Sequence, residues 1–142
     1  MNTIDWTALE MAARNAALSA YCPYSRYHVG AALLAADGTL VTGCNVENAS
    51  YGVTLCAERV ALVKAVSEGR RRFTALVIAA GVDAPATPCG ACLQVLVEFC
   101  APDMPICCVT LEAGRIQPLF FAFRELLPHA FKLEEKDLGV RC

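Results

Sequence analysis

Two short cysteine motifs constrain this chain more than any other feature of its sequence. Cys56-Ala57-Glu58 places a carboxylate two residues after a thiol, and Pro88-Cys89-Gly90-Ala91-Cys92 supplies two more thiols. Three thiolates are suitable ligands for a tetrahedral Zn²⁺ ion, and they leave its fourth position open, as in catalytic zinc sites. A structural site would normally be closed by a fourth Cys or His. The sequence therefore predicts one zinc per chain, held by Cys56, Cys89 and Cys92.

Both motifs lie where a loop enters a predicted helix. Residues 56–67 and 90–100 have helical patterns, with Gly69 just past the end of the first. Residues three apart on a helix share one face, so the sulfurs of Cys89 and Cys92 can reach a single ion. Helix N-termini carry partial positive charge and free N–H groups, which favour thiolates. We therefore expect the metal to lie between two helix ends.

Glu58 and Arg59 are the expected partners of this site. A carboxylate can move protons between water and a substrate, and it is a poor ligand beside three thiolates. The alternative for Glu58 is a helix N-terminal glutamate stabilised by the dipole. Three thiolates give the zinc site a net charge of −1, so we expect Arg59 to compensate by donating to a ligand sulfur. The alternative for Arg59 is an ordinary surface arginine.

The remaining pattern predicts an α/β fold in a single domain. We expect helices at 6–21, 56–67, 90–100 and 123–127, and strands at 28–36, 39–46, 73–82, 105–111 and 116–120. Asp37-Gly38 is a hairpin turn signal. A hairpin followed by alternating strands and helices favours a mixed sheet covered by helices. The 142 residues suit one domain, 1–142, with a loosely held charged tail from about residue 132.

Composition excludes several classes of partner. The net charge is −2 and the only basic run is Arg70-Arg71-Arg72, which argues against a nucleic acid polymer. Apolar runs are interrupted well short of a membrane span. The N-terminal residues lack the pattern of a signal peptide, and the nine cysteines form an odd set in a chain with ample core. We expect a cytoplasmic protein with reduced thiols, no membrane contact and a small uncharged substrate.

Further motifs give the sequence a resemblance that covers nearly the whole chain. The sequence resembles the small homotetrameric cytidine deaminases with a three-cysteine zinc site, in the cytidine and deoxycytidylate deaminase superfamily. The resemblance implies a three-layer α/β/α sandwich around a five-stranded mixed sheet. It also implies zinc-dependent hydrolytic deamination of cytidine and 2′-deoxycytidine in pyrimidine salvage, with release of ammonia. Besides the two cysteine motifs, it is carried by Pro23-Tyr24-Ser25, Val29-Gly30-Ala31-Ala32-Leu33, Gly43-Cys44-Asn45-Val46-Glu47-Asn48-Ala49, Ser67-Glu68-Gly69 and Glu125-Leu126-Leu127-Pro128.

The same resemblance implies a set of substrate-binding residues. Asn45 and Glu47 would bind the sugar, with Glu47 accepting from the 3′-hydroxyl, unless they only cap a turn. Two aromatic residues would lie beside the base, unless they are ordinary core residues. The implied aromatic and backbone contacts are Tyr27 beside the ligand, the backbone of Ala57 at the base, Phe131 from a neighbouring subunit, and Tyr51 across a subunit contact.

One departure and three rival functions follow from the same residues. Leu93-Gln94 replaces the usual Arg-Gln after the last cysteine, which removes a salt bridge or interface contact but no zinc ligand.

The rival functions are a deaminase of another base or nucleoside analogue, a polynucleotide-editing deaminase, and a non-catalytic zinc module. The acidic balance argues against editing, and Glu58 argues against the module. Neither Asn45 nor Glu47 demands a 2′-hydroxyl, so the choice between ribose and deoxyribose stays open.

Overall fold

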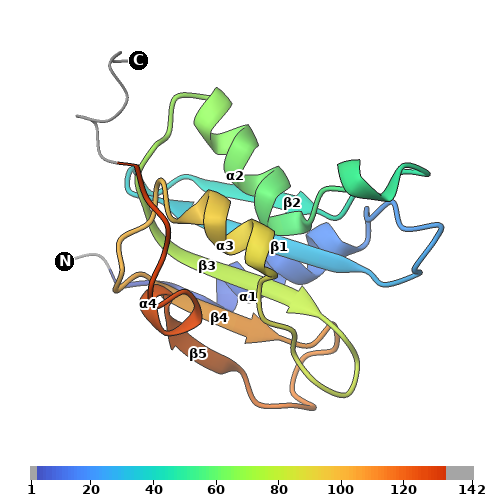
Figure 1. Ribbon diagram of the computed structural model, residues 1–142. Coiled ribbons are helices and arrows are strands. Elements are labelled where there is room, and N and C mark those ends of the chain that lie inside the picture. Colours follow the sequence, from blue (N-terminus) through green and yellow to red (C-terminus); the bar gives the residue numbers. More distant parts are fainter. Residues whose placement is uncertain (1–2, 134–142) are drawn as a thin grey trace.

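The structure of this chain is a computed structural model that describes residues 3–133, with a five-stranded sheet as its middle layer (Figure 1). The strand order is β2-β1-β3-β4-β5. Only β3 and β4 run parallel, and every other neighbouring pair is antiparallel. The predicted five-stranded mixed sheet is therefore confirmed. The strands are β1 (Val29–Ala35), β2 (Leu40–Cys44), β3 (Phe73–Ala80), β4 (Pro105–Val109) and β5 (Leu119–Ala122).

Helices cover both faces of this sheet. In Figure 1, α1 (Trp6–Ala17) lies behind the sheet, while α2 (Ala57–Ser67) and α3 (Gly90–Leu96) lie in front of it. A 3₁₀ turn, η1 (Tyr51–Val53), precedes α2, and the short α4 (Phe123–Leu126) follows β5. The three-layer α/β/α arrangement implied by the resemblance is thus confirmed.

Alternation along the strands explains the two layers of core. Leu33, Leu76 and Ile78 belong to the core cluster beneath α2 and α3. Ala32 and Val77, their neighbours in sequence, belong to the cluster beneath α1. Because successive side chains of a strand point to opposite faces, an apolar run such as β3 can serve both layers.

The helix α1 ends at Ala17, four residues before the predicted end at residue 21. Its start is capped as expected, because the Asp5 carboxylate accepts from the N–H of Ala8 at 3.0 Å. Beyond Ala17 the backbone leaves the helix and pairs with the segment after β2. The Tyr21 N–H donates to the Asn45 carbonyl at 3.0 Å, and the Glu47 N–H donates to the Tyr21 carbonyl at 2.8 Å. This pairing takes precedence over the helical pattern of the sequence.

Two other predicted bounds were wrong. α3 ends at Leu96 rather than at residue 100, because the chain turns there and Phe99 N–H donates to the Leu96 carbonyl. β5 begins at Leu119 rather than at residue 116, directly after Pro118, which has no N–H to donate to a ladder. The other predicted elements agree within two residues at each end. Most of the predicted loose tail lies outside the described residues.

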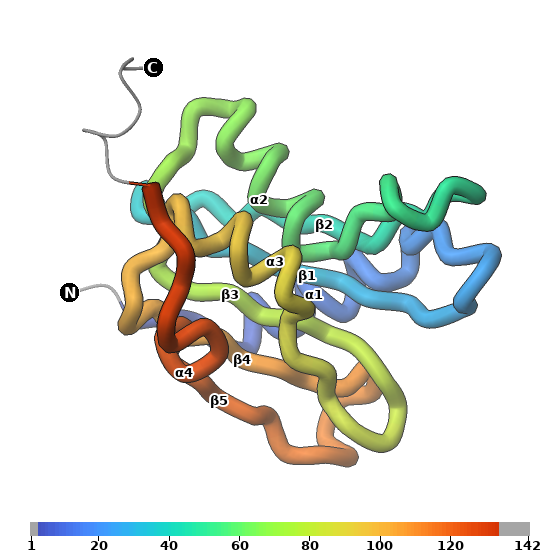
Figure 2. The backbone as a smooth tube through the Cα atoms, in the orientation of Figure 1, coloured from blue at the N-terminus to red at the C-terminus, as the bar shows by residue number. Residues whose placement is uncertain are grey.

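The ends of three strands meet at one side of the sheet. Val29, at the start of β1, pairs with Ala80 at the end of β3, and Gly30 pairs with Cys44 at the end of β2. Figure 2 shows the loops that continue from these ends gathered at the right of the view. Both α2 and α3 begin at the same side, so the two cysteine motifs are brought together there.

No helix within residues 3–133 has the length and apolar character that crossing a bilayer requires.

Candidate active site

The three cysteines of the two motifs form one cluster. The sulfurs of Cys56, Cys89 and Cys92 all lie within 4.8 Å of one another, and the Cys56 and Cys89 sulfurs are 3.7 Å apart. Two sulfurs that each bind a tetrahedral zinc ion at about 2.3 Å are about 3.8 Å apart. The donor atoms and their spacing therefore fit Zn²⁺.

Each cysteine motif is held by the start of a helix. Cys56 is the N-cap residue of α2 and Cys89 is the N-cap residue of α3, and neither side chain caps its own helix. Cys92 lies in the first turn of α3 and is fully buried. The unpaired N–H groups and the positive ends of both helices therefore surround the sulfurs. The expected placement of a metal between two helix ends agrees with this arrangement.

The thiols have unequal acidities. The pKa of Cys56 is lowered to about 5, first by its hydrogen bond with Cys92 and further by Arg59 and Cys89. The pKa of Cys92 is raised, first by the same hydrogen bond with Cys56 and then by burial. Without metal, the first thiolate therefore forms at Cys56. A bound cation favours loss of the remaining protons, since metal ligands must be deprotonated.

Arg59 lies against this thiol. Its Nη2 donates to the Cys56 sulfur at 3.5 Å and to the Thr54 carbonyl at 3.2 Å. The contact with a ligand sulfur that the sequence suggested is therefore present. The Arg59 Nε atom is buried and has no hydrogen-bond partner among the described residues. The cationic side chain is thus positioned to offset the negative charge of the cluster.

Glu58 is a buried carboxylate beside the sulfurs. Only 5% of its surface is exposed, and the Cys92 thiol donates to its Oε2 at 3.6 Å. Burial is the main cause that raises the pKa of this carboxyl. A raised pKa brings the protonated and ionised forms closer in free energy near neutral pH, which suits a group that carries protons.

A cavity of about 290 Å³ opens beside the cluster, and Cys56, Glu58 and Cys89 form part of its wall. Its size suits a small organic ligand of nucleoside dimensions. No Lys, Arg or His is among the described residues that line it, whereas two glutamates are. The charge of the described lining therefore disfavours an anionic ligand. The remaining lining residues are Ser25, Tyr27, Val29, Asn45, Glu47, Thr54, Leu55, Ile78, Ala80, Ala86 and Thr87.

Asn45 fixes one wall of the cavity. Its amide donates to the Tyr27 carbonyl at 2.7 Å and accepts from the Val29 N–H at 3.0 Å. These bonds join the segment after β2 to the start of β1. Asn45 is buried and lines the cavity at the same time. Its side chain therefore joins two segments distant in the sequence instead of capping a turn, and it also lies in the wall of the cavity.

Glu47 organises the loop on the outer side of the cavity. Its Oε1 accepts from the N–H groups of Tyr24 at 3.0 Å and Ser25 at 3.1 Å. Hydrogen bonds from Ser25, the side chain first, and from Tyr24 lower the pKa of the Glu47 carboxyl. Glu47 thus anchors the loop through Oε1 while its carboxylate lines the cavity.

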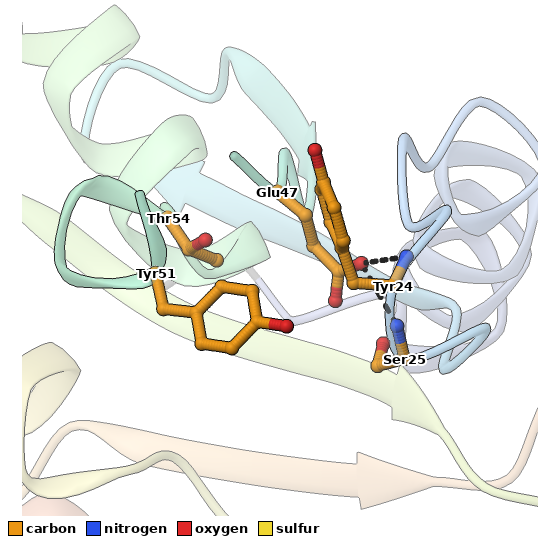
Figure 3. Close-up of a pocket in the computed structure, with 5 residues that line it drawn as sticks. All are labelled: Tyr24, Ser25, Glu47, Tyr51 and Thr54. Carbon is orange, nitrogen blue, oxygen red and sulfur yellow. Dashed lines mark hydrogen bonds between the residues drawn. The ribbon is translucent and has the colours of Figure 1, made fainter. Parts of the chain in front are cut away.

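A second hollow of about 380 Å³ adjoins the cavity on this outer side (Figure 3). It is lined by Tyr24, Ser25, Glu47, Tyr51 and Thr54. The rings of Tyr24 and Tyr51 meet edge to face, with their centroids 5.8 Å apart. Tyr51 therefore lies at the outer hollow and not in the wall of the cavity beside the sulfurs.

The other residues implied by the resemblance occupy different positions. Tyr27 lines the cavity and is 46% exposed, while Ala57 is fully buried as the first residue of α2. Phe131 lines neither hollow, and its ring is exposed at 68%. One chain thus brings Tyr27 to the site but leaves Phe131 on the outside.

Sequence reasoning assigned no role to several lining residues. Ser25 belongs to the motif Pro23-Tyr24-Ser25, and Thr87 precedes the second cysteine motif, so their positions in the sequence carried a signal. Thr54 follows the 3₁₀ turn, and no pattern in the sequence indicated it. Its place depends on how the loop between β2 and α2 folds.

Comparison with known proteins identifies a family and close relatives. Residues 4–108 match the model of the cytidine and deoxycytidylate deaminase zinc-binding region. A cytidine deaminase of Sporosarcina psychrophila is 48% identical over 132 residues, which cover 93% of this chain and 95% of the relative. A cytidine deaminase of Halalkalibacterium halodurans is 51% identical over 118 residues, covering 83% and 87% respectively.

The fold has a solved counterpart as well. The crystal structure of a cytidine deaminase from Burkholderia pseudomallei superposes with a TM-score of 0.84 at 41% sequence identity. The match covers 90% of this chain and 100% of that one. Sequence and fold therefore point to the same group of proteins as the resemblance did.

Proposed function

This chain belongs to the cytidine and deoxycytidylate deaminase family, which is a family of hydrolytic deaminases, and on that premise we propose that it converts cytidine and 2′-deoxycytidine to the uridines. Water replaces the 4-amino group of the pyrimidine, which leaves as ammonia. The observation that carries the proposal is the position of Glu58, a buried carboxylate between a three-sulfur cluster and a nucleoside-sized cavity.

The three cysteines are the proposed zinc ligands. Zinc bound by Cys56, Cys89 and Cys92 supplies a Lewis acid that makes water a better nucleophile. Three thiolates weaken this effect because they leave a net negative charge. The helix ends at Cys56 and Cys89 and the hydrogen bond from Arg59 to Cys56 offset that charge.

Glu58 is the proposed proton carrier. It accepts one proton from the attacking water and delivers it to the ring nitrogen N3, then takes the remaining proton from the new hydroxyl on C4 and delivers it to the departing amine. Burial raises the pKa of the Glu58 carboxyl, which favours its acceptance of a proton. Burial excludes bulk water, so the charges that develop on the ring are stabilised by fixed groups of the site. The Glu58 Oε2 lies 3.6 Å from the Cys92 sulfur, at the edge of the cluster.

The walls of the cavity favour a free nucleoside over a nucleotide. Phosphate groups are usually bound by Lys, Arg or clustered N–H groups, and the described lining has no cationic side chain. The Glu47 carboxylate is suited to accept from the 3′-hydroxyl and would repel a phosphate there. Asn45 holds the wall beside the sugar, while Tyr27 and the backbone of Ala57 contact the base.

Two exposed aromatic residues mark the proposed subunit contacts. Tyr51, at the outer hollow, is 75% exposed, and Phe131, which lines neither hollow, is 68% exposed. In a homotetramer, Phe131 of one subunit would complete the base pocket of another, and Tyr51 would contact a neighbour. We place this assembly in the cytoplasm, where salvage of pyrimidine nucleosides supplies its substrates.

The test is the ultraviolet absorbance of purified protein with cytidine, 2′-deoxycytidine and 2′-deoxycytidine 5′-monophosphate, together with a zinc count. We expect the bands of the two nucleosides to disappear, the nucleotide to persist, and about one zinc per chain. Zinc without turnover of either nucleoside would contradict the proposal and favour a different base. Faster turnover of the nucleotide would contradict the assignment of a free nucleoside.

A further inference from the structure

Gly43 lies where α2 rests on the edge strand β2. A Cβ atom placed on Gly43 would be 2.5 Å from both the carbonyl oxygen of Ala57 and the N atom of Ala61. Real Cβ atoms essentially never come closer than 3.0 Å to such neighbours. Both neighbours are backbone atoms, so no change of rotamer can relieve the contact. Any side chain at residue 43 must therefore move α2 away from β2.

The part of α2 that would move carries half of the metal centre. Cys56 is its N-cap residue, Ala57 its first residue and Glu58 its second. The chain just before Cys56 is already fixed, because Leu55 and Val46 exchange backbone hydrogen bonds of 2.9 and 3.0 Å. A shift of α2 against this anchor changes the position of Cys56 and Glu58. The other two sulfurs belong to Cys89 and Cys92 at the start of α3, whereas the three atoms nearest to a Cβ on Gly43 all belong to α2.

We propose that Gly43 is a positioning residue for the metal centre. It sets the depth at which α2 lies on the sheet, and thereby the distances from Cys56 and Glu58 to the sulfurs on α3. Ala57, Ala61 and Ala65 are fully buried and, at every fourth residue of α2, keep the whole helix equally close to the sheet. The inference concerns metal binding, and it holds whichever base the enzyme deaminates.

Two other glycines provide matched controls. A Cβ on Gly30 would collide with the carbonyl of Ala13 and lie 2.6 Å from the N atom of Ala17, both on α1. That contact is closer still but lies on the opposite face of the sheet, and α1 carries no sulfur of the cluster. A Cβ on Gly52, in the 3₁₀ turn and outside both cysteine motifs, would meet nothing within 4 Å.

The experiment compares Gly43→Ala with Gly30→Ala and Gly52→Ala. Zinc affinity is measured by competition with a chelator, the ligand geometry by the absorption spectrum of the Co²⁺-substituted protein, and stability by thermal unfolding. We expect Gly43→Ala to weaken zinc binding by about 10- to 100-fold and to shift the cobalt–thiolate bands. Gly30→Ala should lower the Tm yet keep the wild-type zinc affinity and spectrum, and Gly52→Ala should change none of the three.

A folded Gly43→Ala protein with wild-type zinc affinity and cobalt spectrum would overturn the inference. So would a Gly30→Ala protein that loses as much zinc affinity as Gly43→Ala, since general loss of packing would then suffice. If Gly43→Ala does not fold, the milder pair Ala61→Ser and Ala65→Ser gives the same test. Ala61→Ser, beside Gly43, should weaken zinc binding more than Ala65→Ser does, and equal affinities would refute the inference. All these readouts are independent of turnover, so they stay distinct from the test of the proposed reaction.

Discussion

The two sides of the cavity are built in different ways. On the metal side, Cys92 is fully buried and Glu58 is 5% exposed, and both lie in the first turn of a helix. On the sugar side, Tyr27 is 46% and Tyr51 75% exposed, and both lie in loops or a single 3₁₀ turn. Helix packing holds the first side. Side-chain bonds from Asn45 and Glu47 to the loop backbone hold the second.

The two sides of the cavity therefore have different proposed roles: the metal side carries the groups for catalysis, and the sugar side carries groups that bind the substrate. The sulfurs, the carboxylate and the arginine of the metal side are all supplied by one chain and already contact one another. The sugar side has exposed aromatic surface and an outer hollow that a second chain can cover. Changes on the metal side should therefore affect metal binding and turnover. Changes on the sugar side should affect substrate affinity and assembly.

The largest expected effect is loss of a ligand sulfur. Cys92→Ala should abolish stoichiometric zinc and, with it, deamination, because two thiolates do not hold the ion against dilution. Cys107→Ala is the control, since Cys107 is also buried but lies in β4 and is not part of the cluster. Zinc counting by atomic spectroscopy and the cytidine assay check both. A Cys92→Ala protein with full zinc content would contradict the assignment of Cys92 as a zinc ligand.

Glu58→Gln should have the next largest effect. Loss of the proton carrier should lower kcat by about 10²- to 10⁴-fold, while zinc content and nucleoside binding persist because the cavity keeps its shape. Glu98→Gln, a change of the same kind on an exposed residue, should leave all three unchanged. Steady-state kinetics and equilibrium binding of cytidine distinguish the outcomes. Substantial turnover by Glu58→Gln would remove this residue from the proton path.

Arg59→Ala should have an intermediate effect on the same side. The substitution removes the hydrogen bond that Arg59 donates to Cys56 and the positive charge beside the cluster. Zinc affinity or kcat should therefore fall by about 10- to 100-fold. Arg71→Ala, on an exposed residue of the α2–β3 turn, is the control. Chelator competition and kcat are the measurements. A zinc affinity and a kcat equal to those of the wild type would show that Arg59 does not support the metal centre.

The smallest effect belongs to the sugar side and depends on pH. The pKa of Glu47 is lowered, so its hydrogen bonds stabilise the fold fully above the ordinary value of 4.5 and are lost as the pH falls through the lowered pKa. On acidification the wild type should therefore lose more stability than Glu47→Gln does. Urea unfolding at about pH 7 and below about pH 4 measures the difference. A constant gap between the two proteins would show that this carboxylate does not organise the loop.

The metal side was predictable from the sequence and the loops were not. Cys89 and Cys92 are three residues apart on a helix start, and Cys56 and Glu58 open another, so local rules place all four. The end of α1 and the placement of Thr54 depend instead on pairing between segments distant in the sequence, such as Tyr21 with Val46. Gly43 was visible as part of a motif, but its close contact with α2 appears only when the helix and the strand are packed together.

The most direct test of the division between chemistry and recognition is a mixed assembly. One chain carries Glu58→Gln and a second, with a different purification tag, carries Phe131→Ala, and only assemblies that contain both are collected. Each chain alone should be impaired, the first in kcat and the second in KM. In the mixture, an intact Glu58 site in the second chain can receive Phe131 from the first.

Cytidine turnover by these mixed assemblies is the deciding measurement. If a neighbouring subunit completes the base pocket, the KM per intact Glu58 site should fall from the Phe131→Ala value toward that of the wild type. A KM that stays at the Phe131→Ala value in assemblies shown to hold both tags would contradict the account, because recognition would then lie within a single chain.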